Sequence, residues 1–193
     1  MIKKIYRNVL RLFYVNNKIF ILKKDSKKNI NLKDEKVFEA EALTNLDIEK
    51  IHHSLRRKVL QRELADNNTI LGFKSEDGHI KHYSCISLEK HGIGEIKQTF
   101  IIPEGAIYIY NCFTEESYRG KKLFQRMLLA IDDLYSSKDK YIAVSPENIP
   151  SYNAIKKAGF YKVAEFRYRK IFFWENLKRN YMNDSLLHCF KNS

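Results

Sequence analysis

Near the middle of the sequence, one unit constrains the fold more than any other: an apolar segment, a basic turn, an amphipathic segment and a second apolar segment follow directly on one another. The first is AIYIYNCFT, residues 106–114, and the last is KYIAVSP, residues 140–146. Both read as β-strands. The amphipathic segment predicts a helix that ends near Ser136, because its apolar residues recur at helical spacing: Leu123, Met127, Leu128, Ile131 and Leu134.

Further strands and helices are predicted on both sides of this unit. The sequence TNLD, which starts at Thr44, is typical of a helix cap, and a helix is predicted from about residue 45 to 65. Asp77-Gly78 lies between two apolar segments and predicts a β-hairpin. The other predicted elements are two short strands within 9–23 joined by an Asn16-Asn17 turn, hairpin strands 69–74 and 79–90, a strand within 95–103, a helix over 150–159 ended by Gly159, and one or two strands within 160–174.

Strands and helices are mixed throughout, without an internal repeat or a composition that marks a linker. Such a mixture predicts an α/β (α+β) fold. At 193 residues the chain is long enough for one domain with a sizeable core. We therefore expect a single domain that spans residues 1–193.

The basic turn is unusual for the start of a helix. Arg119, Gly120, Lys121 and Lys122 precede the apolar face, whereas helix starts usually carry Asp, Glu, Ser or Thr. The unpaired N–H groups of a first helical turn bind anions well, and a phosphate would also pair with these side chains. A solvated basic turn is the alternative, and this segment alone does not decide between them.

Composition adds few constraints on function. The net charge of +12 invites a nucleic-acid or membrane-surface function, but the lysines are scattered, so we take it only as support for an anionic ligand. The three cysteines have no paired or metal-like spacing, which favours a reducing cytoplasm and predicts no metal site. No segment is apolar enough to span a bilayer. The N-terminus MIKKIYRNVLRLFYV is interrupted by Arg7, Asn8 and Arg11 and reads as mature protein rather than as a signal peptide.

Two motifs in the second half occur in an order that resembles the GCN5-related N-acetyltransferase (GNAT) superfamily. YIYNCFTEESYRGKKLFQRML is similar to its acetyl-CoA motif, and NIPSYNAIKKAGF to its second motif, so the resemblance covers about residues 106–162. It implies a central, mixed, mostly antiparallel sheet flanked by helices. It also implies that acetyl-CoA is a substrate, with its pyrophosphate on the backbone of the basic turn and helix start, and its pantetheine arm along the preceding strand.

The residues that match the family's donor site follow from this resemblance. The pyrophosphate positions are Arg119, Gly120, Lys121, Lys122, Leu123 and Phe124, and the pantetheine positions are Cys112, Phe113 and Thr114. The chain departs from the family pattern where Lys122 replaces a common glycine and Phe124 replaces a glycine or alanine. We expect Lys122 to compensate by adding a charged donor.

Three further residues have both a catalytic and a structural interpretation. Asn148 matches an amide that contacts pantetheine, and it would equally cap a helix. The family's frequent tyrosine acid is Ile155 here, so Tyr152, one turn earlier, is the candidate acid, with ordinary packing as the alternative. His82 lies in the strand that borders the acceptor site in this family and is the candidate base, or a surface histidine. We expect no covalent role for Cys112.

The resemblance implies an acetyl-CoA-dependent N-acetyltransferase that acetylates a primary amine in a ternary complex. An amino-sugar nucleotide of surface-polysaccharide synthesis is the expected acceptor. One alternative is a protein or RNA acceptor, and another is a degenerate GNAT-fold module that binds nucleic acid or a protein partner. A homodimer is possible, and nucleic-acid binding is not favoured.

Overall fold

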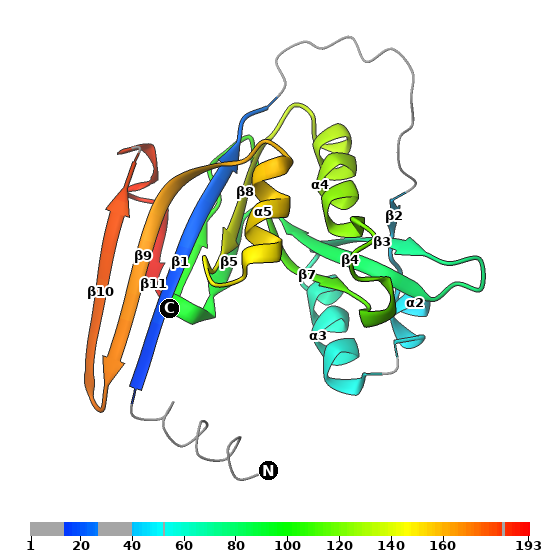
Figure 1. The fold of residues 1–193 in the computed structure, drawn as a ribbon, viewed down its shortest axis with the longest axis horizontal. Helices are drawn as coiled ribbons and strands as arrows, with labels where there is room; N and C mark the ends of the chain where they lie inside the picture. Colours follow the sequence, from blue (N-terminus) through cyan, green and yellow to red (C-terminus); the bar gives the residue numbers. More distant parts are fainter. Residues whose placement is uncertain (1–13, 27–39, 52, 183) are drawn as a thin grey trace.

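The computed structural model describes residues 14–26, 40–51, 53–182 and 184–193. Its centre is an eight-stranded sheet in the order β10-β9-β1-β8-β7-β4-β3-β2, in which only β7 and β8 run parallel (Figure 1). The strands of this sheet are β1 (Tyr14–Lys24), β2 (Glu41–Ala42), β3 (Thr69–Lys74), β4 (Ile80–Ser87), β7 (Ala106–Thr114), β8 (Asp139–Val144), β9 (Tyr161–Ile171) and β10 (Trp174–Tyr181). The predicted mixed, mostly antiparallel sheet is confirmed.

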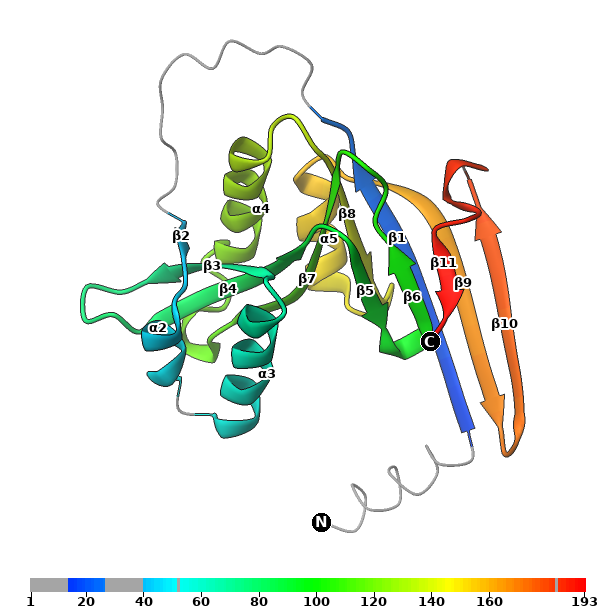
Figure 2. The same cartoon turned by 180° about the vertical axis from the view of Figure 1, so that it is seen from behind.

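Helices cover this sheet on both faces. Helices α4 (Leu123–Leu134) and α5 (Ile149–Lys157) lie on one face, as Figure 1 shows. The other face carries α3 (Ser54–Ala65) and a three-stranded sheet, seen from behind in Figure 2. This second sheet has the order β11-β6-β5, and its strands are β5 (Lys90–Ile93), β6 (Gln98–Ile101) and β11 (Phe190–Asn192).

Each face has its own apolar core. Under α4 and α5, Met127, Leu128 and Ile131 are buried against strand residues such as Ile107 and Ile142. On the opposite face, aromatic rings from both sheets pack together: Phe100, Tyr108, Tyr141, Phe166 and Phe190. Among the described helices, none combines the length and the hydrophobicity that crossing a membrane requires.

Most of the predicted elements are confirmed. The 69–90 hairpin, the strand of residues 106–114 and the helix after the basic turn are all present. Thr44 forms the expected capping box with Asp47. Helix α5 is followed by Gly159 at φ +91°, the left-handed conformation typical of a residue after a helix end.

Two predictions are wrong. Asn16-Asn17 is not a turn, because β1 passes through both residues and pairs with β8 on one edge and β9 on the other; residues 9–13 of that predicted hairpin lie outside the described residues. The helix predicted over 45–65 is two helices, α2 (Asn45–Glu49) and α3. The predicted helix is interrupted because α2 ends at Lys50 and a new helix begins after His53. The His53 ring caps this second helix by accepting a hydrogen bond from the Arg56 N–H.

Candidate active site

The two parallel strands of the sheet separate where the candidate site begins. Strands β7 and β8 pair from Ala106 and Asp139 as far as Ile109 and Ile142, and no pair follows. Within the described residues, no strand pairs with the β8-facing edge of residues 110–114. The sheet therefore opens at this end, and among the described residues the β7 backbone has no strand partner along one side of the opening.

A β-bulge in β7 lies at the same point. Cys85 of β4 pairs with Tyr110 and Tyr83 with Phe113, so one β4 residue faces two β7 residues, Asn111 and Cys112. Asn111 has φ +45°, a left-handed conformation that asparagine tolerates better than most residues. A bulge re-aims the groups of one strand and is common beside active sites. Here it lies where the strands diverge.

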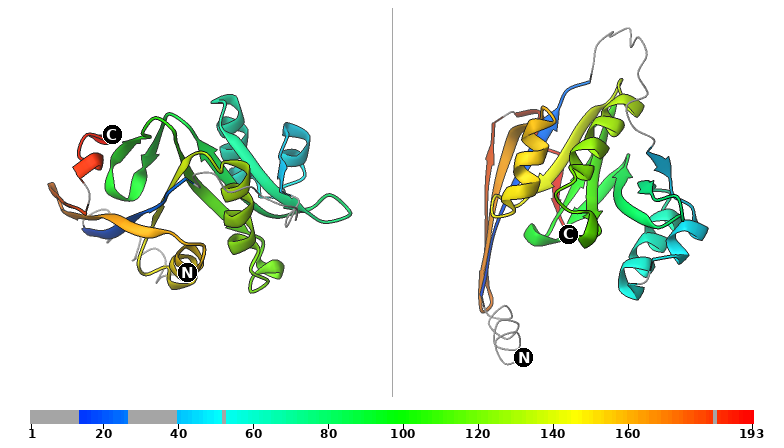
Figure 3. Two further views of the ribbon diagram at one scale, coloured as in Figure 1. Left: turned by 90° about the horizontal axis from the view of Figure 1, so that it is seen from above. Right: turned by 45° about the vertical axis from the view of Figure 1, so that its right-hand side comes forward.

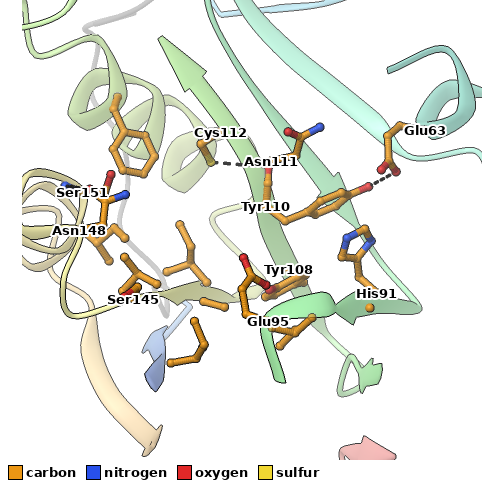
Figure 4. Close-up of a pocket in the computed structure, with 18 of the residues that line it drawn as sticks. Glu63, His91, Glu95, Tyr108, Tyr110, Asn111, Cys112, Ser145, Asn148 and Ser151 are labelled. Atoms are coloured by element: carbon orange, nitrogen blue, oxygen red, sulfur yellow. Dashed lines mark hydrogen bonds between the residues drawn. The ribbon is translucent and has the colours of Figure 1, made fainter. Parts of the chain in front are cut away.

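A cavity of about 470 Å³ occupies this opening. Its walls come from the diverging ends of β7 and β8, the start of α5, and α3 and β5 on the opposite side (Figure 4). The volume is in the usual range for a site that holds a small ligand or one end of a larger one. Two glutamates, Glu63 and Glu95, line the cavity, and no Lys or Arg is among the described residues that do so.

One side of the cavity carries a cluster of polar and aromatic groups. The hydroxyl of Tyr110 donates a hydrogen bond to Glu63, whose Oε2 also accepts one from Asn68 at 2.9 Å. The ring of His91 stacks on that of Tyr110, with centroids 3.6 Å apart. Burial lowers the pKa of His91, an effect that attraction to Glu63 partly opposes. His91 is therefore neutral at pH 7 and able to accept a proton.

The basic turn lies at the start of α4 and has an unusual backbone. Gly120 and Lys122 have φ +78° and +58°, and the side chain of Lys122, the N-cap residue, makes no capping hydrogen bond. Arg119, Lys121 and Lys122 are exposed. N–H groups at a helix start with cationic side chains beside them have the chemistry that favours binding of an anion.

The structure brings three of the predicted residues to the cavity: Cys112, Phe124 and Asn148. Burial raises the pKa of the Cys112 thiol to about 12, so it is not a thiolate at pH 7. Asn148 also caps α5, because its Oδ1 accepts a hydrogen bond from the Ser151 N–H at 3.3 Å. The capping interpretation of Asn148 is thus confirmed, and its side chain still lies at the cavity wall.

His82 lies inside the protein, and it is not among the residues that line the cavity. Its ring nitrogens lie 2.8 Å from Thr114 Oγ1 and 3.2 Å from Ser84 Oγ, and its ring packs near Phe124. Burial lowers its pKa to about 4. This placement offers no support for His82 as a general base, and it also rules out the surface histidine.

The side chain of Tyr152 packs against Phe20 with ring centroids 5.7 Å apart. Ile155, and not Tyr152, is among the residues that line the cavity. The predicted proton donor is therefore outside the cavity, and its catalytic function stays a prediction. Phe113 and Thr114 are also outside the cavity. They continue β7 along its pairing with β4, and the rings of Phe113 and Tyr83 are 5.6 Å apart.

The sequence analysis missed Glu63, His91 and Glu95. They come from α3, β5 and the short turn after β5, and no motif surrounds them. Only the packing of these elements across the open end of the sheet brings them together. Among the described residues, no group of three or more His, Cys, Asp or Glu side chains is arranged to hold a metal ion.

A comparison with solved structures identifies the architecture. A GNAT-family acetyltransferase from Colwellia psychrerythraea aligns with a TM-score of 0.55 at 10% identity over 86% of this chain. A GNAT-family protein from Novosphingobium aromaticivorans aligns with a TM-score of 0.54 at 10% identity over 87%. The chain has the fold of the GCN5-related N-acetyltransferases. It covers 61% and 66% of those two chains, less than two thirds of each.

The likeness to GCN5-related N-acetyltransferases is one of fold and not of sequence. A scan against protein-family models found no match, and a comparison with curated proteins found none either. The fold does place the two sequence motifs around the open end of the sheet, one on β7 and α4 and the other on α5. The activity has to be argued from that site.

Proposed function

We propose that the protein is an acetyl-CoA-dependent N-acetyltransferase. The observation that carries this proposal is the opening between β7 and β8, with a bulge on one side and the uncapped basic start of α4 beside it. A long ligand with a phosphate at one end and an amide-bearing arm at the other matches both features. Acetyl-CoA is such a ligand.

The donor would bind along the open edge of β7. The amides of the pantetheine arm pair with the unpartnered backbone of residues 112–114, as an added strand would. The pyrophosphate binds the backbone N–H groups of residues 119–124, supported by the dipole of α4. Gly120 keeps the turn open to this approach, because no described residue other than its two chain neighbours has an atom within 4 Å of the position a Cβ would take.

The acceptor amine would enter from the side of Glu63 and His91. Glu63 attracts its ammonium form, and neutral His91 accepts the proton that the nitrogen must lose. The amine nitrogen then attacks the thioester carbonyl carbon, the C–S bond breaks, and the CoA thiolate leaves and takes up a proton. Tyr110 positions Glu63 through its hydrogen bond. Holding donor and acceptor together supplies a large part of the rate gain.

The charge of the cavity bears on the acceptor class. The sequence suggested an amino-sugar nucleotide, with a protein or RNA amine as the alternative. A diphosphate inside this cavity would face Glu63 and Glu95 without a basic side chain to pair with. A small cationic amine would be attracted by the same residues. We therefore propose that such an amine is the acceptor, and that a nucleotide sugar would fit only with its diphosphate outside the cavity.

Steady-state kinetics of Glu63→Gln test this assignment. With acetyl-CoA and a small diamine, we expect the KM for the diamine to rise about tenfold to a hundredfold, because a hydrogen bond to a charged group is lost. The KM for acetyl-CoA should stay near that of the wild type. Glu76→Gln is the control, since Glu76 is exposed in the β3–β4 turn and its replacement changes the net charge equally.

Three outcomes would contradict the proposal. An unchanged diamine KM in Glu63→Gln, or faster acetylation of a UDP-amino sugar than of any small cationic amine, would refute the acceptor class. No acetyl transfer and no acetyl-CoA binding, together with salt-sensitive nucleic-acid binding, would indicate the degenerate binding module instead.

A further inference from the structure

The turn between β9 and β10 has residues that its geometry does not favour. Ile171 pairs with Trp174, so Phe172 and Phe173 alone form a two-residue turn. Phe172 has φ +53°, and Phe173 is not among the residues with positive φ. Glycine usually occupies the first position of such a turn, because a side chain there is strained. A phenylalanine at this strained first position, followed by a second one, indicates selection for something other than stability.

The same turn exposes several large apolar side chains. Phe173 is 95% exposed and Trp174 is 83% exposed. On the adjoining strands, Tyr14 pairs with Ile171 and Ile171 with Trp174, which places two more exposed apolar side chains in one row with Trp174. Large apolar side chains gathered at a projecting point are typical of an interaction site. Figure 3 (right) shows the turn projecting beyond α5 and the small sheet.

Basic residues lie directly behind this apolar row, on the same face of the sheet. Side chains two residues apart on a strand share a face and lie about 7 Å apart. The first row inward contains Arg169, between Asn16 and Asn176. The second consists of three cations side by side: Lys18, Arg167 and Lys178.

Carboxylates offset only part of this charge. Glu165 binds Lys18 and Arg167, each at 3.0 Å. Within the described residues, no ion pair joins Arg169 or Lys178 to a carboxylate. Like charges directly opposite one another destabilise a sheet. Glu165 relieves this repulsion for Lys18 and Arg167, and Lys178 and Arg169 remain as cations that an anionic surface could pair with.

We propose that this end of the protein binds the surface of an anionic lipid bilayer. Phe172, Phe173 and Trp174 enter the interfacial region, and the two basic rows contact lipid phosphates about 7 and 14 Å behind them. Tryptophan suits this depth, since its ring is apolar and its N–H polar. A convex, strained apolar tip fits a deformable bilayer better than a nucleic acid, whose stacking and phosphate contacts favour a groove.

The binding end is also the end that carries the candidate active site. Strands β8 and β9 both run antiparallel to β1, so their C-terminal ends lie at the same side of the sheet. Ser145, directly after β8, lines the cavity, and Ile171 ends β9. Membrane binding does not depend on the proposed acetyl transfer, and each can fail without the other.

The single tryptophan of the chain makes a direct test possible. Vesicles of phosphatidylcholine mixed with phosphatidylglycerol should shift the Trp174 emission to shorter wavelength, and the full-length protein should sediment with them. Vesicles of phosphatidylcholine alone should bind far less. Phe173→Ser should weaken binding on the order of tenfold, because the free energy gained by burying the phenylalanine side chain in the bilayer is lost. Arg169→Gln with Lys178→Gln should weaken it by about fivefold for each charge.

Matched controls come from α3, away from this turn. Leu55→Ser and Lys58→Gln alter an exposed leucine and an exposed lysine and should leave vesicle binding unchanged. Phe172→Gly with Phe173→Ser should lose binding while the melting temperature holds or rises, because the strained residue is relieved. A fall in both vesicle binding and melting temperature would indicate that the two phenylalanines stabilise the fold and do not bind the bilayer directly.

Other results would overturn the proposal. Absence of an emission shift and of sedimentation with anionic vesicles would do so, as would equal binding to both vesicle types. An emission shift produced by duplex DNA, or by raising the protein concentration without lipid, would assign the surface to nucleic acid or to a second copy of the chain.

Discussion

His82 shows how burial sets the chemistry of a single residue. Its pKa falls from 6.5 to about 4 because the imidazolium form loses its hydration in the interior, while the neutral ring keeps contacts with Thr114 and Ser84. Between these pH values the unfolded chain binds a proton that the folded chain does not. Stability therefore falls as the pH drops from 6.5 to 4, by about 3 kcal/mol from this residue.

His82→Gln tests that value. Glutamine does not titrate and can still hydrogen-bond, so we expect the loss of unfolding free energy between pH 6.5 and 4 to become smaller by about 3 kcal/mol. Urea unfolding at a series of pH values measures it. His188→Gln is the control, because it makes the same substitution at an exposed histidine and leaves the buried ring of His82 in place. A profile unchanged in His82→Gln would mean that the folded protein protonates His82 normally.

Lys122 stands where glycine is common in the family, but its backbone has the left-handed conformation that a glycine would adopt easily. It keeps the left-handed conformation, at a cost of about 1–2 kcal/mol that glycine would avoid. The backbone N–H groups at the start of α4 therefore keep the arrangement that a glycine would give. The strain is compatible with the compensation expected from the sequence, in which a cationic side chain is retained next to a phosphate site.

At the scale of elements, one buried carboxylate joins four of them. Asp132 of α4 lies 2.9 Å from Lys140 of β8 and 2.8 Å from Lys24 of β1. Lys24 also donates a hydrogen bond to the carbonyl of Ala158, at the end of α5. Asp132 and Lys140 are 2% and 0% exposed, so hydration by bulk water cannot replace the ion pair for either charge.

Removing this carboxylate should destabilise the protein strongly. Asp132→Ala leaves Lys140 as an unpaired buried cation, and we expect the free energy of unfolding to fall by about 3–5 kcal/mol. Chemical denaturation measures the loss. Asp133→Ala on the same helix changes an exposed carboxylate and should cost less than about 1 kcal/mol. Equal effects of the two substitutions would show that the buried pair contributes nothing specific.

Elements were predictable from the sequence where a local signal decided them. The capping box at Thr44, the Asp77-Gly78 turn and the 3.6-residue periodicity of α4 are such signals. Asn16-Asn17 carried an equally good turn signal, but β8 and β9 pair with β1 on both sides and keep it extended. The bulge at Asn111 and the meeting of Glu63 with His91 depend on pairing and packing between distant segments, which no local pattern encodes.

At the scale of the whole molecule, charge is distributed unevenly. The chain has a net charge of +12, yet the charged residues at the cavity are Glu63 and Glu95. Two groups of positive side chains lie outside the cavity, one at the basic turn before α4 and one on the outer face of the long strands. This separation gives the proposed donor phosphates, the acceptor amine and the lipid surface three different electrostatic environments.

The central claim is that acetyl-CoA binds at the basic turn, and calorimetric titration of Gly120→Val tests it most directly. Gly105→Val is a close control, because both glycines have positive φ, +78° and +73°, and open space around the Cβ position. Valine should strain both turns similarly, but only at residue 120 would it obstruct the pyrophosphate. We predict that the wild type and Gly105→Val bind acetyl-CoA with the same affinity. Gly120→Val should bind it at least about tenfold more weakly, because one good hydrogen bond to a charged group is lost. Wild-type affinity in Gly120→Val, or no binding by the wild type, would contradict the account.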